Sequence, residues 1–220
     1  RSFSLRARAV TVDLGGQVVD TWAYGDSVPG KALRATAGDR VLVDFANDLP
    51  MATSVHWHGL AIRNDMDGAP GVTTPETRPG GSFAFDFVVP DAGTHWFHPH
   101  HGLQLDRGLY APFIVDDPDE PGRYDAEWIV VLDDWTDGVG PSPERILSDL
   151  RAAGGTGTDG GMGGMDGGDV AYPLCLVNGR VSSDPQTLAA RPGDRVRLRM
   201  INAAADTIFT LAIGDHAFTV

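Results

Sequence analysis

The chain has 220 residues, of which 42% are apolar, and a formal net charge of −13. This length and composition suit one large globular domain or two ordinary ones. The acidity is concentrated in residues 116–149, which contain eleven Asp and Glu residues and only two basic ones, Arg123 and Arg145. This excess of negative charge argues against a nucleic-acid partner. No run of about eighteen apolar residues occurs, so the sequence predicts no membrane span.

Short alternating segments bounded by Gly, Pro, Asn and Asp dominate the chain and predict β-strands. In the first half these segments are Ser4–Val10, Arg40–Phe45, Ser54–His58, Ser82–Val88, Gly93–Phe97 and Tyr110–Val115. A further strand is expected at Glu127–Leu132, and one short helix is expected at Pro143–Ala152, where a proline precedes apolar residues on one helix face. Strands this short and frequent predict an all-β fold of Greek-key sandwiches.

An internal repeat indicates two similar domains. Residues 37–47 and 192–202 match at Gly-Asp-Arg-Val and at a closing Asn, with a constant offset of 155. We place the boundary in the proline-rich, charged stretch 116–122, with a first domain at 1–117 and a second at 125–220. The second domain is expected to be incomplete at Val220.

Two features of the second domain carry weaker signals. Residues 154–168 are rich in Gly and Met and are interpreted as a flexible insertion. The thioethers of Met162 and Met165 offer a minor alternative as transient Cu(I) ligands. The single cysteine, Cys175, lies in the apolar run Leu174–Val177 and is predicted to be a buried, inert thiol.

Four of the seven histidines form two His-x-His pairs, His56 with His58 and His98 with His100. On a strand, side chains two residues apart point to the same face, with Cα atoms roughly 6.5–7 Å apart, so one pair suits two neighbouring metal ions. Trp57 is then expected to point into the core. Imidazole ligands without a thiolate favour copper, zinc or iron over magnesium or calcium. The two pairs together predict a metal cluster at one rim of a sandwich.

These motifs resemble the copper signatures of the multicopper oxidases, the laccase-like enzymes. His56–Gly59 followed by Asp67–Gly71 is similar to the first signature, and Gly93–Gly102 is similar to the second. The resemblance implies tandem cupredoxin-like domains and a trinuclear copper cluster, between the first and last domains, that reduces O₂ to water. The implied ligands are His56 for the type-2 copper and, for the type-3 pair, His58, His98 and His100.

Half of the site implied by the resemblance has no counterpart in this sequence. The family carries four His-x-His motifs and a type-1 copper site around His-Cys-His, which Cys175, between two leucines, does not match. In the second copy of the repeat, Leu211 and Ile213 stand where the first copy has His56 and His58. We therefore expect the N-terminal part of a three-domain oxidase, with a C-terminal domain elsewhere and no turnover by this chain alone.

Asp67 is the acid singled out for a catalytic role. It lies nine residues after His58, and reduction of O₂ consumes protons that a solvent-accessible carboxylate can deliver. The resemblance also implies an acidic proton relay in this loop, while a plain Asp-Gly turn remains the alternative. Other candidates are assigned turns or the surface (Asp65, Asp91, Asp106), structural positions (His95, His101) or a hairpin (His216).

The leading hypothesis is the oxygen-reducing part of a laccase-like oxidase that takes electrons from phenols, aromatic amines or metal ions such as Cu(I). The resemblance implies an extracellular or periplasmic location. A copper-binding or copper-tolerance module without turnover would use the same histidines. A copper nitrite reductase is disfavoured because it needs a type-1 cysteine in its first domain, and an interaction protein without copper is disfavoured because all four histidines are present.

Overall fold

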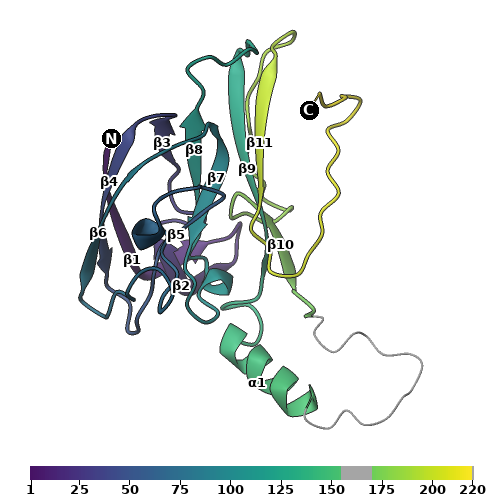
Figure 1. Ribbon diagram of the computed structural model, residues 1–220. Helices are drawn as coiled ribbons and strands as arrows, with labels where there is room; N and C mark the ends of the chain where they lie inside the picture. Colours follow the sequence, from purple (N-terminus) through teal and green to yellow (C-terminus); the bar gives the residue numbers. More distant parts are fainter. Residues whose placement is uncertain (155–169, 220) are drawn as a thin grey trace.

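The computed structural model describes residues 1–154 and 170–219, and these residues form an all-β fold with three short helices (Figure 1). The predicted insertion at 154–168 lies, apart from Gly154, outside the described residues. Among those described, no helix has the length and apolarity to cross a membrane. The helices are η1 Asn64–Met66, η2 Leu105–Arg107 and α1 Pro143–Gly154. The strands are β1 Ser2–Asp13, β2 Val18–Tyr24, β3 Leu33–Thr36, β4 Arg40–Asn47, β5 His56–His58, β6 Ser82–Val88, β7 Gly93–His98, β8 Ala111–Asp116, β9 Ala126–Trp135, β10 Leu174–Val177 and β11 Val196–Asn202.

The first 116 residues form a sandwich of two four-stranded sheets, with strand orders β2-β1-β4-β6 and β3-β8-β7-β5. Along β4 the buried residues Val41, Val43 and Phe45 alternate with exposed ones, which is the period expected for a half-buried strand. Trp57 is fully buried, with its ring centroid 5.1–5.6 Å from those of four phenylalanines. The prediction that Trp57 points into the core is confirmed.

The predicted strands of the first half are all present, and β6 has the predicted bounds. Two strands, β2 and β3, were not predicted. The inward residues of β2 are Val19, Thr21 and Ala23, and two of these are too weakly apolar to produce a clear alternation. β3 has only four residues, too few for a periodic signal.

The sequence repeat corresponds to a repeated turn and strand. Gly38 and Gly193 adopt φ angles of +89° and +92°, a region that favours glycine. The carboxylates of Asp39 and Asp194 each accept the backbone N–H three residues earlier, at 2.9 and 2.7 Å. The strands that follow these turns are β4 and β11. β4 pairs in parallel with β1, and β11 pairs in parallel with β9. On their other sides, β1 and β9 pair antiparallel with β2 and β10.

The closing asparagines of the repeat also make matching contacts. The Oδ1 atoms of Asn47 and Asn202 accept the backbone N–H two residues later, at 3.0 and 3.1 Å. Their Nδ2 atoms donate to the carbonyls of Met51 and Thr207, at 2.9 and 3.1 Å. An Asn side chain that bonds to its own following backbone redirects the chain at a strand end. The repeated Asn therefore has a structural role in both copies.

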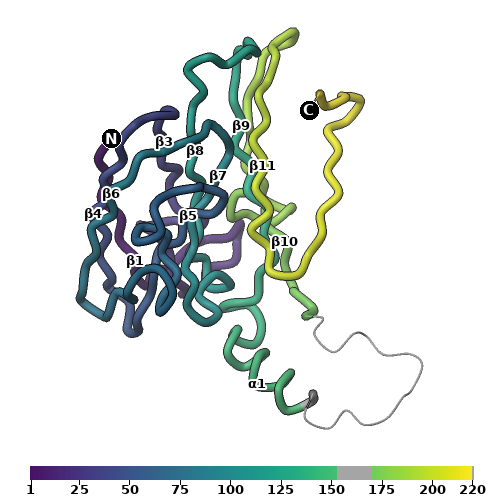
Figure 2. Tube along the Cα trace, viewed as in Figure 1, coloured from purple at the N-terminus to yellow at the C-terminus, as the bar shows by residue number. Residues whose placement is uncertain are grey.

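The three-stranded sheet β10-β9-β11 packs against the outside of the sandwich, and β9 and β11 run side by side in Figure 2. A buried apolar cluster joins the two parts. It takes Val12, Leu14, Val19, Ala23, Val28 and Tyr110 from the sandwich and Val131, Trp135, Leu176, Ile201 and Ala203 from the second part. After β11, residues 203–219 contain no strand (yellow in Figure 2).

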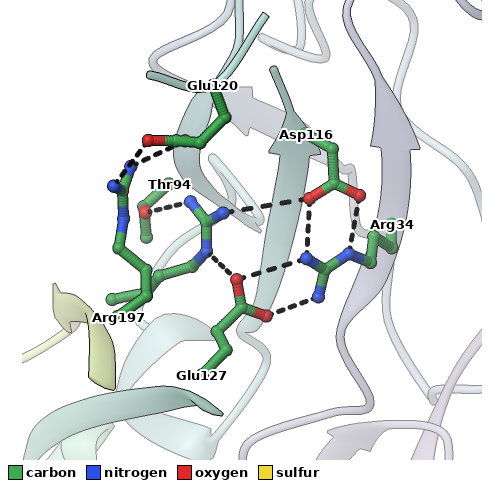
Figure 3. A network of polar contacts seen from close by, with 7 residues as sticks. Arg34, Thr94, Asp116, Glu120, Glu127 and Arg197 are labelled. Carbon is green, nitrogen blue, oxygen red and sulfur yellow. Dashed lines mark hydrogen bonds and ion pairs between the residues drawn. The ribbon is translucent and has the colours of Figure 1, made fainter. Parts of the chain in front are cut away.

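A network of ion pairs also crosses this junction (Figure 3). Arg34 of β3 bonds to Asp116 at the end of β8 and to Glu127 of β9. Arg199 of β11, with only 3% of its side chain exposed, pairs with Glu127 at 2.6 Å and donates to Thr94 of β7 at 3.2 Å. Because each buried charge has an opposite charge or a hydroxyl as its partner, the network compensates for part of the desolvation of Arg199.

Three sequence predictions need correction. Cys175 is exposed rather than buried, because alternation along β10 sends Leu176 into the core and leaves the thiol on the open face. Asp106 lies in the short helix η2 rather than in a turn or at the surface. It is half-buried, and its carboxylate accepts a hydrogen bond from Tyr172 at 3.2 Å. Burial raises the pKa of Asp106 to about 6. His216 lies at a turn, but no strand flanks it within residues 203–219.

Candidate metal centre

Strands β5 and β7 bring the two histidine motifs together. They pair antiparallel, with His56 opposite His98, Trp57 opposite Phe97, and His58 opposite Trp96. Because side chains alternate across a pleated sheet, Trp57 and Phe97 both enter the core, where they are fully buried. The histidines of this register consequently share the opposite face.

His100 reaches the same place by a different route. β7 ends at His98, and Pro99 has no N–H to continue the ladder. The backbone N–H of His100 instead donates to the hydroxyl of Ser54 at 2.9 Å, two residues before His56. The imidazole of His100 then lies with its centroid 4.3 Å from that of His56.

All four predicted ligands are therefore neighbours. The ring centroids of His56 and His58 lie 5.9 Å apart, and those of His98 and His100 lie 5.2 Å apart. Across the strands, His98 lies 5.5 Å from His56 and 5.3 Å from His58. Ligand nitrogens of His56, His98 and His100 all lie within 4.8 Å of one another.

Backbone carbonyls set which imidazole nitrogens are free. The Nδ1 atom of His56 lies 2.8 Å from the carbonyl oxygen of Asp67, and that of His98 lies 3.1 Å from the carbonyl oxygen of Pro99. A carbonyl only accepts, so Nδ1 carries the proton in both rings and Nε2 keeps its lone pair. Carbonyl contacts of this kind orient histidines that ligate metals.

The free nitrogen of His98 faces the second histidine of the first motif. Its Nε2 atom lies 3.1 Å from Nδ1 of His58. Imidazole nitrogens bind ions such as Zn²⁺ at about 2 Å, so two ligands of one ion lie about 3–4 Å apart. The separation between His58 and His98 fits a shared ion.

Burial favours the neutral form of three of these rings. It lowers the pKa of His98 to about 4, and burial followed by the neighbouring imidazoles lowers the pKa of His58 and of His100. Neutral imidazole is the form that binds a metal. At neutral pH a proton therefore does not compete with a metal ion for His98.

Two supporting residues were not predicted. Trp96 stacks against His58 and His98, with centroids 4.8 and 4.3 Å apart and planes inclined by 29° in both cases. A signal for this existed, because Trp96 stands two residues before His98 and thus shares its strand face. No sequence signal indicated Ser54, since its contact with His100 depends on how two distant loops meet.

Asp67 lies in a turn and also next to His56. It follows η1 and precedes Gly68, whose φ of +85° marks a turn. Its carboxylate Oδ1 lies 3.3 Å from Nδ1 of His56, and 28% of the side chain is exposed. The turn and the proximity to the histidines thus coexist.

The other first-sandwich histidines lie outside this cluster. His95 packs against Gly59 and Gly93, where an added Cβ would come within 3.1 and 2.8 Å of its ring nitrogens. Nδ1 of His101 lies 4.0 Å from a carboxylate oxygen of Glu76.

Two four-stranded sheets packed as a sandwich are typical of cupredoxin-like domains, and here the rim carries four convergent imidazoles. Family models described as multicopper oxidase match residues 6–120 and 126–220. The chain belongs to the multicopper oxidase family.

Named relatives agree with this assignment. The chain is 49% identical to "Multicopper oxidase MmcO" of Mycobacterium tuberculosis over 99% of its own length and 45% of the relative. It is 33% identical to "Copper resistance protein A" of Pseudomonas syringae pv. tomato, over 99% of the chain and 41% of the relative. A multi-copper oxidase crystal structure from Pseudomonas Thermotolerans superposes with a TM-score of 0.73 at 28% identity, covering 94% of this chain and 47% of that one. The chain thus spans less than half the length of these proteins.

Proposed function

We propose that His56, His58, His98 and His100 supply half of the ligands of a trinuclear copper cluster. His56 would serve the type-2 copper and the other three the type-3 pair. The observation that carries this proposal is the convergence of four imidazoles from two paired strands, with Nδ1 of His58 and Nε2 of His98 only 3.1 Å apart.

The donor set fits copper. Imidazole nitrogens without a thiolate suit copper, and membership of a copper-using family selects copper among the ions such ligands take. His58 and His98 are the pair that we assign to one ion, because their nitrogens already face each other. The rings of His56 and His100 lie beside this pair, with their own centroids 4.3 Å apart.

We propose that the whole protein oxidises small substrates one electron at a time, with phenols, aromatic amines or metal ions such as Cu(I) as the substrate class. When bound, the copper cluster supplies the four-electron reduction of O₂ to water. The residues of this chain orient the imidazoles, and burial favours the neutral form of His58, His98 and His100. The carbonyls of Asp67 and Pro99 fix two of the rings, and Trp96 limits the rotation of His58 and His98.

Asp67 is proposed as the proton relay of this reaction. Its carboxylate reaches water on one side and lies 3.3 Å from the His56 ring on the other. A carboxylate in this position can take a proton from solvent, hold it at Oδ1 and release it into the site. D67N would keep the shape of the side chain and remove this capacity.

The architecture is also a proposal. We divide the chain into cupredoxin domains at 1–117 and 125–220, with the remaining copper ligands and the type-1 site on a further domain of the same protein. Cys175, between Leu174 and Leu176 on β10, lacks the flanking histidine of a type-1 site. An extracellular or periplasmic location is proposed from the family alone.

A second candidate function has one observation in its favour. The similarity to a protein named for copper resistance suits a copper-binding module that sequesters the metal without turnover. A nitrite reductase remains disfavoured, because the only cysteine of the sequence is Cys175. The two surviving candidates share the histidines and differ in oxygen consumption.

Copper content and oxygen uptake of the full-length protein separate these candidates. We expect the wild type to consume O₂ with a phenolic reductant, and H58A to lose copper and more than about 100-fold of the uptake. H216A is the matched control, because His216 lies in a turn outside the cluster, and it should keep both properties. Bound copper without oxygen uptake would favour the copper-resistance module. Equal copper content in H58A and the wild type would contradict the site.

A further inference from the structure

The loop that follows the first histidine motif does more than carry Asp67. Its backbone contacts the ring of His56, since the Asp67 carbonyl accepts from Nδ1 at 2.8 Å. This contact leaves Nε2 as the nitrogen available to a metal. The position of the Asp67 carbonyl therefore decides how His56 presents itself, and whatever holds that carbonyl acts on the metal site.

Gly68 lets the loop come this close. It is buried and adopts a φ of +85°, and a Cβ on this residue would lie 1.7 Å from the carbonyl oxygen of Val55 and 2.9 Å from Cα of His56. The loop backbone is thus pressed directly on the strand that carries His56. Only glycine fits here, because a Cβ would overlap with backbone that cannot move aside.

One side chain fixes this close approach. The backbone N–H of Gly68 donates to the hydroxyl of Thr74 at 2.9 Å, a bond that is fully buried. Thr74 is 5% exposed, so no water competes for the N–H. The far end of the loop is anchored by two bonds between the backbones of Thr53 and Thr77, at 2.8 and 3.0 Å. Thr74, near the anchored end of the loop, is therefore bonded to Gly68, the loop residue that packs most closely against β5.

We propose that Thr74 is a positioning residue of the metal site: its hydroxyl holds Gly68 against β5, which keeps the Asp67 carbonyl on Nδ1 of His56 and Nε2 free for copper. This inference rests on the proposed function for the identity of the metal. Its structural half, the control of the His56 tautomer, does not depend on copper.

The chain offers a conservative variant and a matched control. T74V keeps the shape and removes the acceptor, while T74S keeps the hydroxyl. T73V makes the same substitution one residue earlier. The Thr73 hydroxyl accepts the N–H of Ala69 at 3.0 Å and lies 3.3 Å from the Thr74 hydroxyl, but it does not contact Gly68. His98, whose Nδ1 faces the Pro99 carbonyl, is an internal reference in every variant.

The first measurement is the tautomer of His56, read from two-bond ¹H–¹⁵N correlations of the full chain without metal. We expect the proton on Nδ1 in the wild type, T74S and T73V, and a shift of proton occupancy toward Nε2 in T74V, with His98 unchanged in all four. An unchanged His56 tautomer in folded T74V would overturn the proposal. Loss of the His98 tautomer together with that of His56 would also overturn it, since it would indicate general disorder.

The second measurement is a titration of the same four proteins with copper sulfate, followed by the EPR signal of Cu(II). We expect T74V to bind about 10–100-fold more weakly than the wild type, the usual effect of removing support behind a metal-binding histidine, and T74S to restore binding. Equal affinities in T74V and the wild type would contradict the role of Thr74. Absence of copper binding by the wild type would contradict the proposed function and leave the tautomer measurement to decide on Thr74.

Discussion

The two copies of the repeat share a turn, a parallel strand and a closing asparagine, but within the described residues they differ in which face of the strand is covered. In β4, Phe45 faces the sandwich core with 1% exposure, whereas Met200, its counterpart in β11 at the offset of 155, is 47% exposed. Asp44 is exposed in the first copy, and its counterpart Arg199 is buried. Within the described residues, the same local sequence thus builds the same strand against different packing partners.

The difference extends to the metal site. In the first copy the chain continues from Asn47 to the strand of His56 and His58, which pairs with β7. In the second copy the corresponding positions are Leu211 and Ile213, and no strand forms in residues 203–219. In the described residues, only the first copy combines a histidine pair with a second ligand strand beside it.

The largest expected effect tests the covered face of the first copy. F45A should lower the free energy of unfolding by about 3–5 kcal/mol, because it removes an aromatic side chain from a packed core. M200A, at the equivalent position, should change it by less than about 1 kcal/mol, because that face is open in the described residues. Urea denaturation of the chain measures both. Equal losses would contradict the assignment of opposite buried faces.

A slightly smaller effect is expected at the neighbouring position. R199M should destabilise the chain by about 3 kcal/mol, since it leaves the half-buried Glu127 with only its second partner, Arg34. D44A, its counterpart in the first copy, should have an effect within about 0.5 kcal/mol, because Asp44 is exposed. The same urea denaturation measures both variants. An unchanged free energy of unfolding in R199M would contradict a stabilising role of the junction network.

The smallest effect concerns the junction between the two parts and depends on pH. Burial raises the pKa of Asp106 to about 6 from an ordinary value near 3.8. The folded chain therefore binds more protons than the unfolded chain between these values, and stability falls as pH rises through this window. Thermal melts from pH 3.5 to 7 should show a steeper decline in the wild type than in D106N. Parallel curves would exclude the raised pKa.

Sequence predicted the parts of the fold that depend on local chemistry. The alternation of β4 and β6 and the Trp57 position each follow from a few adjacent residues. β2 was missed because Thr21 and Ala23 weaken its pattern. Cys175 was misplaced because its apolar neighbours say nothing about which face of an edge strand is covered.

The candidate site divides in the same way. The His-x-His spacing predicts that His56 and His58 share a face, and the pairing of two such motifs at one rim follows from a sandwich. The placement of His100 by Ser54, and of the Asp67 carbonyl by Thr74, depends on contacts between loops that no spacing rule encodes. Those contacts can be identified only from the three-dimensional structure.

Diffraction from crystals of the full chain soaked in copper, with data collected on both sides of the copper absorption edge, locates any copper bound by the four histidines. We expect anomalous peaks within about 2 Å of Nδ1 of His58 and Nε2 of His98, and beside the rings of His56 and His100. Peaks confined to other residues, or imidazoles turned away from one another, would contradict this expectation.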